Sequence, residues 1–138
     1  MGFSRLRASL VSALIAIVLQ GCASVTAHGV VKTAAGDPVG DASLTLSEES
    51  GTLTAKAETD LRGCFNVYQP VPGGDRSFVL HVSAPGYKSL DVTVRMQDRP
   101  ILLVTLARDG SPGQSSSRLL EQGDTTYDVP CLPHAIPR

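Results

Sequence analysis

The sequence predicts an all-β fold, a seven-stranded antiparallel β-sandwich. Short segments of alternating apolar and polar residues recur about every 10 to 12 residues, Gly- and Pro-rich turn signals separate them, and no segment has the period of an amphipathic helix. The composition agrees, because the 138 residues include 13 Gly and 9 Pro but only three Phe, three Tyr and no Trp.

The first 21 residues have the layout of a signal peptide. Arg5 and Arg7 give a basic start, and residues 8–19 form a mostly apolar run. A permanent membrane-spanning helix needs about 20 apolar residues. We therefore expect residues 1–21 to be an export signal that is removed from the mature protein.

The end of this leader, Leu19-Gln20-Gly21-Cys22, resembles the lipobox of bacterial lipoproteins, where a peptidase cuts before a lipidated cysteine. The resemblance implies acyl chains such as palmitate on Cys22 and a membrane-anchored protein. Ala23 in the next position implies the outer membrane, with the protein facing the periplasm. An ordinary secretory signal with a cysteine nearby is the alternative.

The mature chain is large enough for one domain. Residues 22–138 keep 10 of the 12 basic residues and all 13 acidic ones, which gives a net charge of −3 with no run of like sign. A surface built for nucleic acid would be basic, so no nucleic-acid partner is expected.

The first half of the domain contains the expected strands at residues 29–33, 42–47 and 52–59. Residues 22–28 are polar and short, so we expect a tether that reaches about 20 Å. Gly and Pro mark a turn at residues 35–40. Ala42, Leu44 and Leu46 then alternate with hydroxyl residues, which is typical of a half-buried strand.

The second half contains the expected strands at residues 64–68, 78–83, 89–95 and 101–106. A turn at residues 60–63 precedes the first of them, in which Phe65 and Val67 should point inward. Residues 84–87 form another turn. The Ser-, Gly- and Pro-rich residues 108–138 are expected to be a flexible tail.

Four segments occur in the order that one domain family shows: Gly29-Val30-Val31, residues 36–44, residues 59–65 (TDLRGCF), and Ala84-Pro85-Gly86-Tyr87. Residues 29–107 thereby resemble the carboxypeptidase regulatory-like domain family. The resemblance implies a prealbumin-like sandwich that usually accompanies another activity and is not itself catalytic.

The motif residues are expected to have structural rather than binding roles: Asp60, Gly63, Phe65, Pro85, Gly86 and Tyr87. Glycine allows backbone angles that a side chain would resist, and an Asp in a turn can accept hydrogen bonds from nearby amides. Tyr87 resembles a corner tyrosine that bonds back to the main chain.

The three cysteines allow one disulfide. If Cys22 carries lipid, Cys64 and Cys131 remain as a single pair in an oxidising compartment. Their bridge would enclose 66 residues and contribute about 4 kcal/mol in the chain-entropy description. The alternative is a buried free Cys64 and an exposed free Cys131.

No catalytic, metal or cofactor site is expected. His28, His81 and His134 lack the spacing of a short metal motif, and the chain has no nucleophile elbow. Transthyretin-like hydrolases of purine breakdown end in Tyr-Arg-Gly-Ser, whereas this chain ends at residues 135–138 with Ala-Ile-Pro-Arg.

The sequence therefore favours a noncatalytic envelope lipoprotein whose sandwich binds a protein partner through its loops or a strand edge. A carbohydrate-binding module is the alternative. With no Trp to stack on a sugar, such a site would depend on Phe residues or on Tyr68, Tyr87 and Tyr127.

Overall fold

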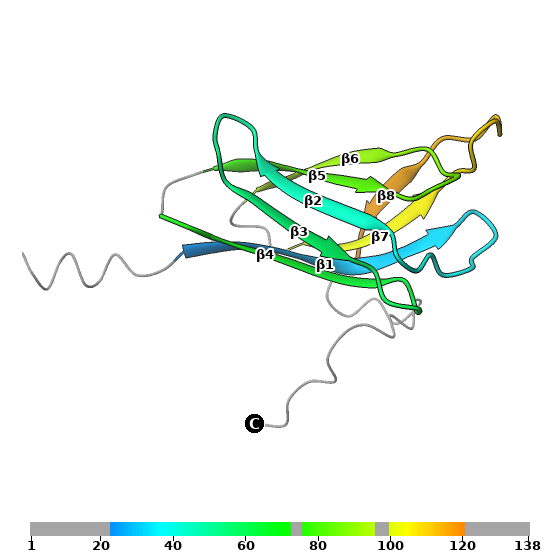
Figure 1. Cartoon of the computed structure of the whole chain (residues 1–138), viewed down its shortest axis with the longest axis horizontal. Coiled ribbons are helices and arrows are strands. Elements are labelled where there is room, and N and C mark those ends of the chain that lie inside the picture. Colours follow the sequence, from blue (N-terminus) through cyan, green and yellow to red (C-terminus); the bar gives the residue numbers. More distant parts are fainter. Residues whose placement is uncertain (1–22, 73–75, 96–99, 121–138) are drawn as a thin grey trace, which may run out of the picture.

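Two β-sheets stack face to face in the computed structural model, which describes residues 23–72, 76–95 and 100–120 (Figure 1). Within these residues there are eight strands, and no helix there is long and apolar enough to cross a bilayer. The predicted all-β sandwich is confirmed, with one strand more than expected.

The first sheet has the strand order β4-β1-β7-β8. Its strands are β1 (Ala23–Thr33), β4 (Cys64–Val71), β7 (Ile101–Leu106) and β8 (Ser116–Leu119). β1 pairs antiparallel with β4 and parallel with β7. This parallel pair departs from the wholly antiparallel sandwich that we expected, because the chain crosses to the second sheet between β1 and β7.

The second sheet is antiparallel throughout and has the strand order β3-β2-β5-β6. Its strands are β2 (Ser43–Glu48), β3 (Thr54–Glu58), β5 (Ser77–Ser83) and β6 (Leu90–Arg95). Residues 52–53, which we expected in β3, precede the strand.

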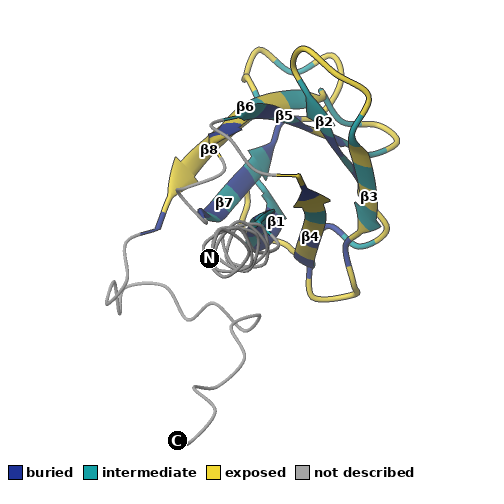
Figure 2. Cartoon of the chain, turned by 90° about the vertical axis from the view of Figure 1, so that its left-hand side faces the viewer, coloured by how far each residue is buried: buried dark blue, intermediate teal, exposed yellow. Residues whose placement is uncertain are grey.

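The core lies between the two sheets, where buried residues line the inner faces (Figure 2). Leu44 and Leu46 of β2 face Phe65 and Val67 of β4 across it, and Phe78 of β5 is fully buried. Each fully buried side chain of this size contributes about 1.5–3 kcal/mol. The predicted inward positions on β2 and β4 are therefore buried in this core.

The expected tether is instead the first half of β1. Residues 23–28 pair with residues 66–71 of β4, and Val25 and Ala27 are fully buried. The prediction was wrong because small, weakly apolar residues alternate here with polar ones, so the two-residue period is faint. The described part of the sandwich therefore begins at Ala23.

One strand lies beyond residue 107, where we expected a flexible tail. β8 lies in the expected tail and pairs with β7. Its sequence, SSRL, is wholly exposed and has no apolar period by which it could be recognised. The described part of the sandwich therefore extends to Leu120.

Pro70 and Val71 belong to β4, which therefore runs past residue 68, where we expected this strand to end. β4 is the last strand of its sheet, and an edge strand tolerates proline because its outward N–H has no ladder partner. The apolar–polar alternation alone could not show that this strand is at an edge.

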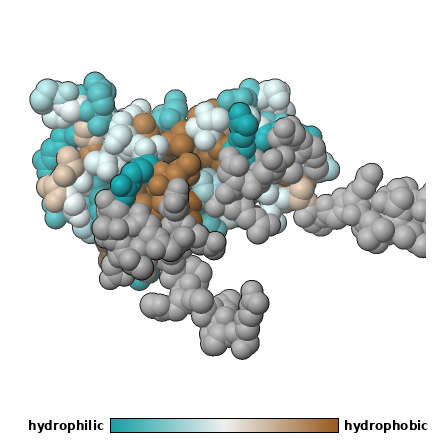
Figure 3. Space-filling view, turned by 180° about the vertical axis from the view of Figure 1, so that it is seen from behind, coloured by the Kyte–Doolittle hydropathy of each residue, from teal (hydrophilic) through white to brown (hydrophobic). Residues whose placement is uncertain are grey.

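One side of the sandwich exposes apolar groups. Leu119 of β8 lies opposite the buried Leu102 of β7, yet is 65% exposed, and Leu90 and Val92 of β6 are only partly buried. Figure 3 shows apolar surface on the back of the molecule, the side where β6 and β8 lie.

Candidate functional site

Three loops gather at one end of the sandwich, which we call the loop end: residues 33–41, 84–88 and 107–115. β1 begins at the opposite end with Ala23 and reaches the loop end at Thr33, where the loops lie together on the right of Figure 1. An extended strand of this length covers about 35 Å. The loop end and residue 23 are therefore separated by the length of the sandwich.

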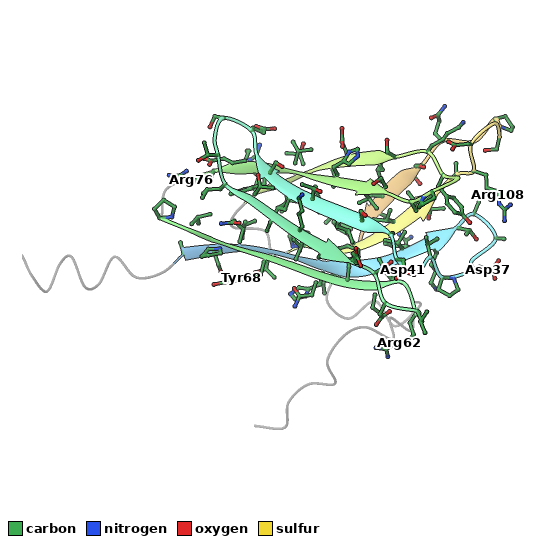
Figure 4. The ribbon with its side chains drawn as sticks, viewed as in Figure 1. Asp37, Asp41, Arg62, Tyr68, Arg76 and Arg108 are labelled. Atoms are coloured by element: carbon green, nitrogen blue, oxygen red, sulfur yellow. The ribbon has the colours of Figure 1, made fainter. Side chains whose placement is uncertain are left out.

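A pocket of about 420 Å³ opens at the loop end. Leu106 and Ala107 contribute an apolar wall, and the polar lining comes from Thr33, Asp37, Thr105, Arg108, Ser111 and Gln114. Figure 4 shows Asp37 and Arg108 at this same end. The lining offers a carboxylate, a guanidinium, an amide and hydroxyls, which suit recognition by hydrogen bonds and ion pairs.

The turn after β1 builds one wall of the pocket. Thr33 N donates to Asp37 O at 2.8 Å and Gly36 N donates to Thr33 O at 2.9 Å, while Thr33 Oγ1 accepts from Asp37 N at 3.2 Å. Gly36 has a φ of 93°, which favours glycine. These bonds place Asp37 beside the pocket.

Lys88 holds the opposite wall. Its Nζ donates to Ser111 O and Gly113 O, each at 2.6 Å. Ser115 Oγ donates to Lys88 O at 2.6 Å and accepts from Ala107 N at 3.0 Å. One lysine thus fastens residues 107–115 to the corner before β6.

The Ala84-Pro85-Gly86-Tyr87 corner supports Arg108. Tyr87 N donates to Ala84 O at 3.1 Å, and Gly86 has a φ of 82°. The Arg108 guanidinium lies 6.0 Å from the centre of the Tyr87 ring, a contact worth about 0.5–1 kcal/mol at an exposed site. Tyr87 packs partly against the core and orients a residue that lines the pocket.

Asp60 organises the turn before β4. Its Oδ1 accepts from Arg62 N at 2.9 Å and from Cys64 N at 3.0 Å. The hydrogen bond from the Cys64 amide, followed by those from Arg62, holds the pKa of Asp60 below its ordinary value. Gly63 has a φ of 79°, and Phe65 is buried just after the turn. Asp60 therefore accepts hydrogen bonds from within its own turn.

Thr59 is the buried polar residue beside this turn. It is 3% exposed, and its hydroxyl donates to Val39 O at 2.7 Å and accepts from Ala42 N at 2.9 Å. The side chain therefore ties the loop after β1 to the turn before β4.

The two described histidines lie apart. His81 of β5 is exposed, and its Nδ1 contacts Asp91 Oδ1 of β6. His28 of β1 is half-buried, and burial lowers its pKa below the ordinary value. Within the three described ranges, no group of three His, Cys, Asp or Glu side chains could hold a metal ion.

Cys64 begins β4 opposite Val30 of β1. It has an interaction partner beyond its contact with Asp60. Cys22, Cys131, Tyr127 and His134 lie outside the described residues. Lipidation of Cys22 and the pairing of Cys64 with Cys131 therefore stay predictions.

Sequence reasoning did not identify Thr59, Lys88 or Arg108 in these roles. Lys88 Nζ bonds residues 23 and 25 positions away, and the Thr59 hydroxyl reaches 20 positions back. No local pattern encodes such distances. The position of Lys88 directly after the AlaProGlyTyr corner was the one available signal.

The fold resembles that of solved structures with little sequence identity. Klebsiella pneumoniae 5-hydroxyisourate hydrolase matches with a TM-score of 0.52 and 17% identity, over 72% of this chain and 100% of that one. Chlorocatechol 1,2-dioxygenase from Pseudomonas putida matches with a TM-score of 0.48 and 11% identity, over 63% and 61%. At 17% identity, the likeness to the hydrolase concerns the fold alone.

No curated protein matches the sequence. The profile of the carboxypeptidase regulatory-like domain matches residues 26–107, more than half of the chain. The matched range begins within β1 and ends one residue after β7, so it leaves the pocket residues Arg108, Ser111 and Gln114 outside. The chain belongs to the carboxypeptidase regulatory-like domain family.

Proposed function

We propose that this protein is a noncatalytic lipoprotein, anchored through Cys22 in the outer membrane and facing the periplasm, whose loop end binds a protein partner. One observation carries the proposal. β1 starts directly after the predicted lipidation site and ends at the pocket. A lipid on Cys22 would hold the Ala23 end against the membrane and direct the loop end away from it.

The chemistry of the loop end supports a binding role. Asp37 and Arg108 supply charges of both signs beside hydroxyl and amide groups. Oppositely charged groups of this kind orient a partner and exclude competitors. Lys88 and the Thr33 turn fix the two walls, so little ordering would be needed on binding.

The anchor is tested by metabolic labelling with a palmitate analogue in a Gram-negative host. The wild-type chain should take up the label and sediment with the outer membrane, whereas Cys22→Ser should lose both properties. Incorporation that survives Cys22→Ser would refute the anchor.

The binding surface is tested with a photo-crosslinking amino acid in place of Gln114, and with a matched one in place of Lys56, an exposed residue on β3. We expect a defined crosslinked partner from position 114, reduced by the Asp37→Lys change, and none from position 56. Hydrolytic turnover by the purified protein that a single substitution abolishes would contradict the noncatalytic assignment.

We also propose that Cys64 and Cys131 form a disulfide. Each thiol would lose its proton, and the two electrons would pass to a disulfide-bearing oxidant of the envelope by thiol–disulfide exchange. Peptide mapping under non-reducing conditions should recover one crosslinked peptide that contains both residues.

Carbohydrate binding is the second candidate, favoured by the mixed carboxylate, amide and hydroxyl lining of the pocket. The wild-type protein would then bind oligosaccharides on a glycan array, and Gln114→Ala would weaken that binding. If no oligosaccharide on the array binds and position 114 crosslinks to a protein, the result favours protein binding over carbohydrate binding.

A further inference from the structure

The outer face of the first sheet, which points away from the core, carries an unexpected apolar row. Val30 of β1 lies on this face, because Val25, Ala27 and Val31 of the same strand point into the core. Its direct neighbours across the sheet are Cys64 and Leu103. Val30 is nevertheless only 2% exposed.

The burial extends to the neighbouring row of the same outer face, which His28, Ile101 and Leu120 form across the sheet. Leu120 lies next to Ile101, whose carbonyl accepts a 2.8 Å hydrogen bond from Leu120 N, and is 9% exposed. Ile101 and Leu103 are half-buried. In the same row, His28 has a pKa lowered by burial. The second sheet lies on the other side (Figure 2), so it cannot cover this row.

We propose that the C-terminal segment, residues 121–138, crosses this outer face from Leu120 toward Cys64 and covers Val30, Ile101 and Leu103. The segment starts at the right place, because it continues from Leu120 at the β8 edge. Three strand spacings, roughly 15 Å, separate β8 from β4. The ten residues between Leu120 and Cys131 can span about 33 Å.

The chemistry of segment and face is complementary. The charged residues of this face, within the described strands, are Lys32 and Arg118, and no carboxylate lies on it. The segment carries its acids at Glu121, Asp124 and Asp128 and has no Lys or Arg before Arg138. The segment also contains Tyr127, Val129, Leu132 and Ile136, whose apolar side chains could pack on Val30 and its neighbours.

The covering segment is independent of the proposed partner, because it uses the side of the first sheet and not the loop end. It assigns to residues 121–138 a stabilising role within the domain. A second copy of the chain or a lipid chain on the same face would be a different occupant, and the experiment separates these outcomes.

The test is methyl NMR on the full mature chain in detergent micelles. We expect nuclear Overhauser effects between the methyl groups of Val30 or Leu103 and side chains of residues 121–138. Val79, a half-buried residue on the outer face of the second sheet, should show none. A sample that mixes two isotope labels identifies contacts from a second copy. Contacts only to a second copy, only to detergent, or only within the sheet overturn the proposal.

A variant gives an independent readout. Leu103→Asp should place a carboxylate under the segment and raise the rate of proteolytic cleavage after residue 120 by about tenfold or more, because cleavage follows the population of the open form. Val79→Asp is the matched control and should leave that rate unchanged. Equal rates in Leu103→Asp and wild type, with both folded by circular dichroism, overturn the proposal.

Discussion

At the scale of single residues, the Thr59 hydroxyl is the buried polar contact on which two loops depend. It bonds Val39 O and Ala42 N where water is excluded. Thr59→Val keeps the shape but leaves a buried donor and a buried acceptor without their partner. We expect the free energy of unfolding to fall by about 1–3 kcal/mol, measured by urea denaturation. Thr59→Ser keeps the hydroxyl and should lose less; an equal loss in both variants would contradict this role.

Two glycines with similar backbone angles differ in their surroundings. Gly63 and Gly86 have φ values of 79° and 82°, so a side chain at either position costs about 1–2 kcal/mol. A Cβ on Gly63 would lie 2.4 Å from Val31 O, whereas one on Gly86 meets nothing within 4 Å.

Gly63→Ala should therefore destabilise the protein by about 1–3 kcal/mol more than Gly86→Ala does, because the added methyl group overpacks the turn. Thermal unfolding of the two variants measures the difference. Equal melting temperatures would show that the contact with Val31 relaxes at no cost.

His28 gives the domain a pH dependence with a defined sign. Burial lowers its folded pKa below the ordinary 6.5, so between the two values the unfolded chain binds more protons. Stability should be unaffected above pH 6.5 and should fall as the pH drops from 6.5 toward the folded pKa.

The comparison of wild type with His28→Gln by urea denaturation at several pH values measures this contribution, which the variant should lack. His81→Gln, at an exposed position, should retain it. An NMR titration that gives His28 a pKa of 6.5 or higher would reverse the expected sign.

At the scale of elements, β1 organises the first sheet because it pairs on both sides. Gly29 lies at its centre, and a Cβ there would lie 2.0 Å from Leu102 O and 2.9 Å from Phe65 Cζ. The G-x-V motif of the family thus marks a point where β7 and the Phe65 ring approach this strand too closely for a side chain. The sequence identified the motif, and the packing explains it.

β8 depends on a contact made outside its own strand. Its residues are exposed, and Lys88 secures the loop that leads to it through Ser111 and Gly113. Lys88→Met removes both charge-assisted hydrogen bonds, each worth about 1.5–3 kcal/mol. We expect faster amide hydrogen exchange in residues 116–119, with β2 unchanged.

Lys56→Met is the matched control for this prediction, because Lys56 is an exposed lysine on β3. It should leave exchange in β8 as it is in the wild type. Unchanged exchange in Lys88→Met would mean that pairing with β7 alone holds β8.

At the scale of the whole molecule, the proposed disulfide would join the start of β4 to the end of the chain. A loop of 66 residues makes its entropic contribution about 4 kcal/mol. Cys131→Ser should lower the free energy of unfolding by up to that amount, and adding Cys64→Ser should lower it little further. Full stability of Cys131→Ser, in the presence and absence of a reductant, would exclude a stabilising bridge.

The sequence by itself determined the sandwich, most of its strands and its family, because alternation, turn residues and the ordered motifs are local properties. The inward positions of Leu44 and Phe65 followed from the two-residue period. The Gly63 and Gly86 turns followed from the backbone freedom of glycine.

Only the tertiary structure decided that residues 23–28 are part of β1, that β8 belongs to the sandwich, and that Asp37 and Arg108 line one pocket at the loop end. These features depend on contacts between residues far apart in the chain. β8 has no apolar period because an exposed edge strand is held by backbone bonds to β7 and by the fastening of its loop, and neither leaves a local pattern in the sequence.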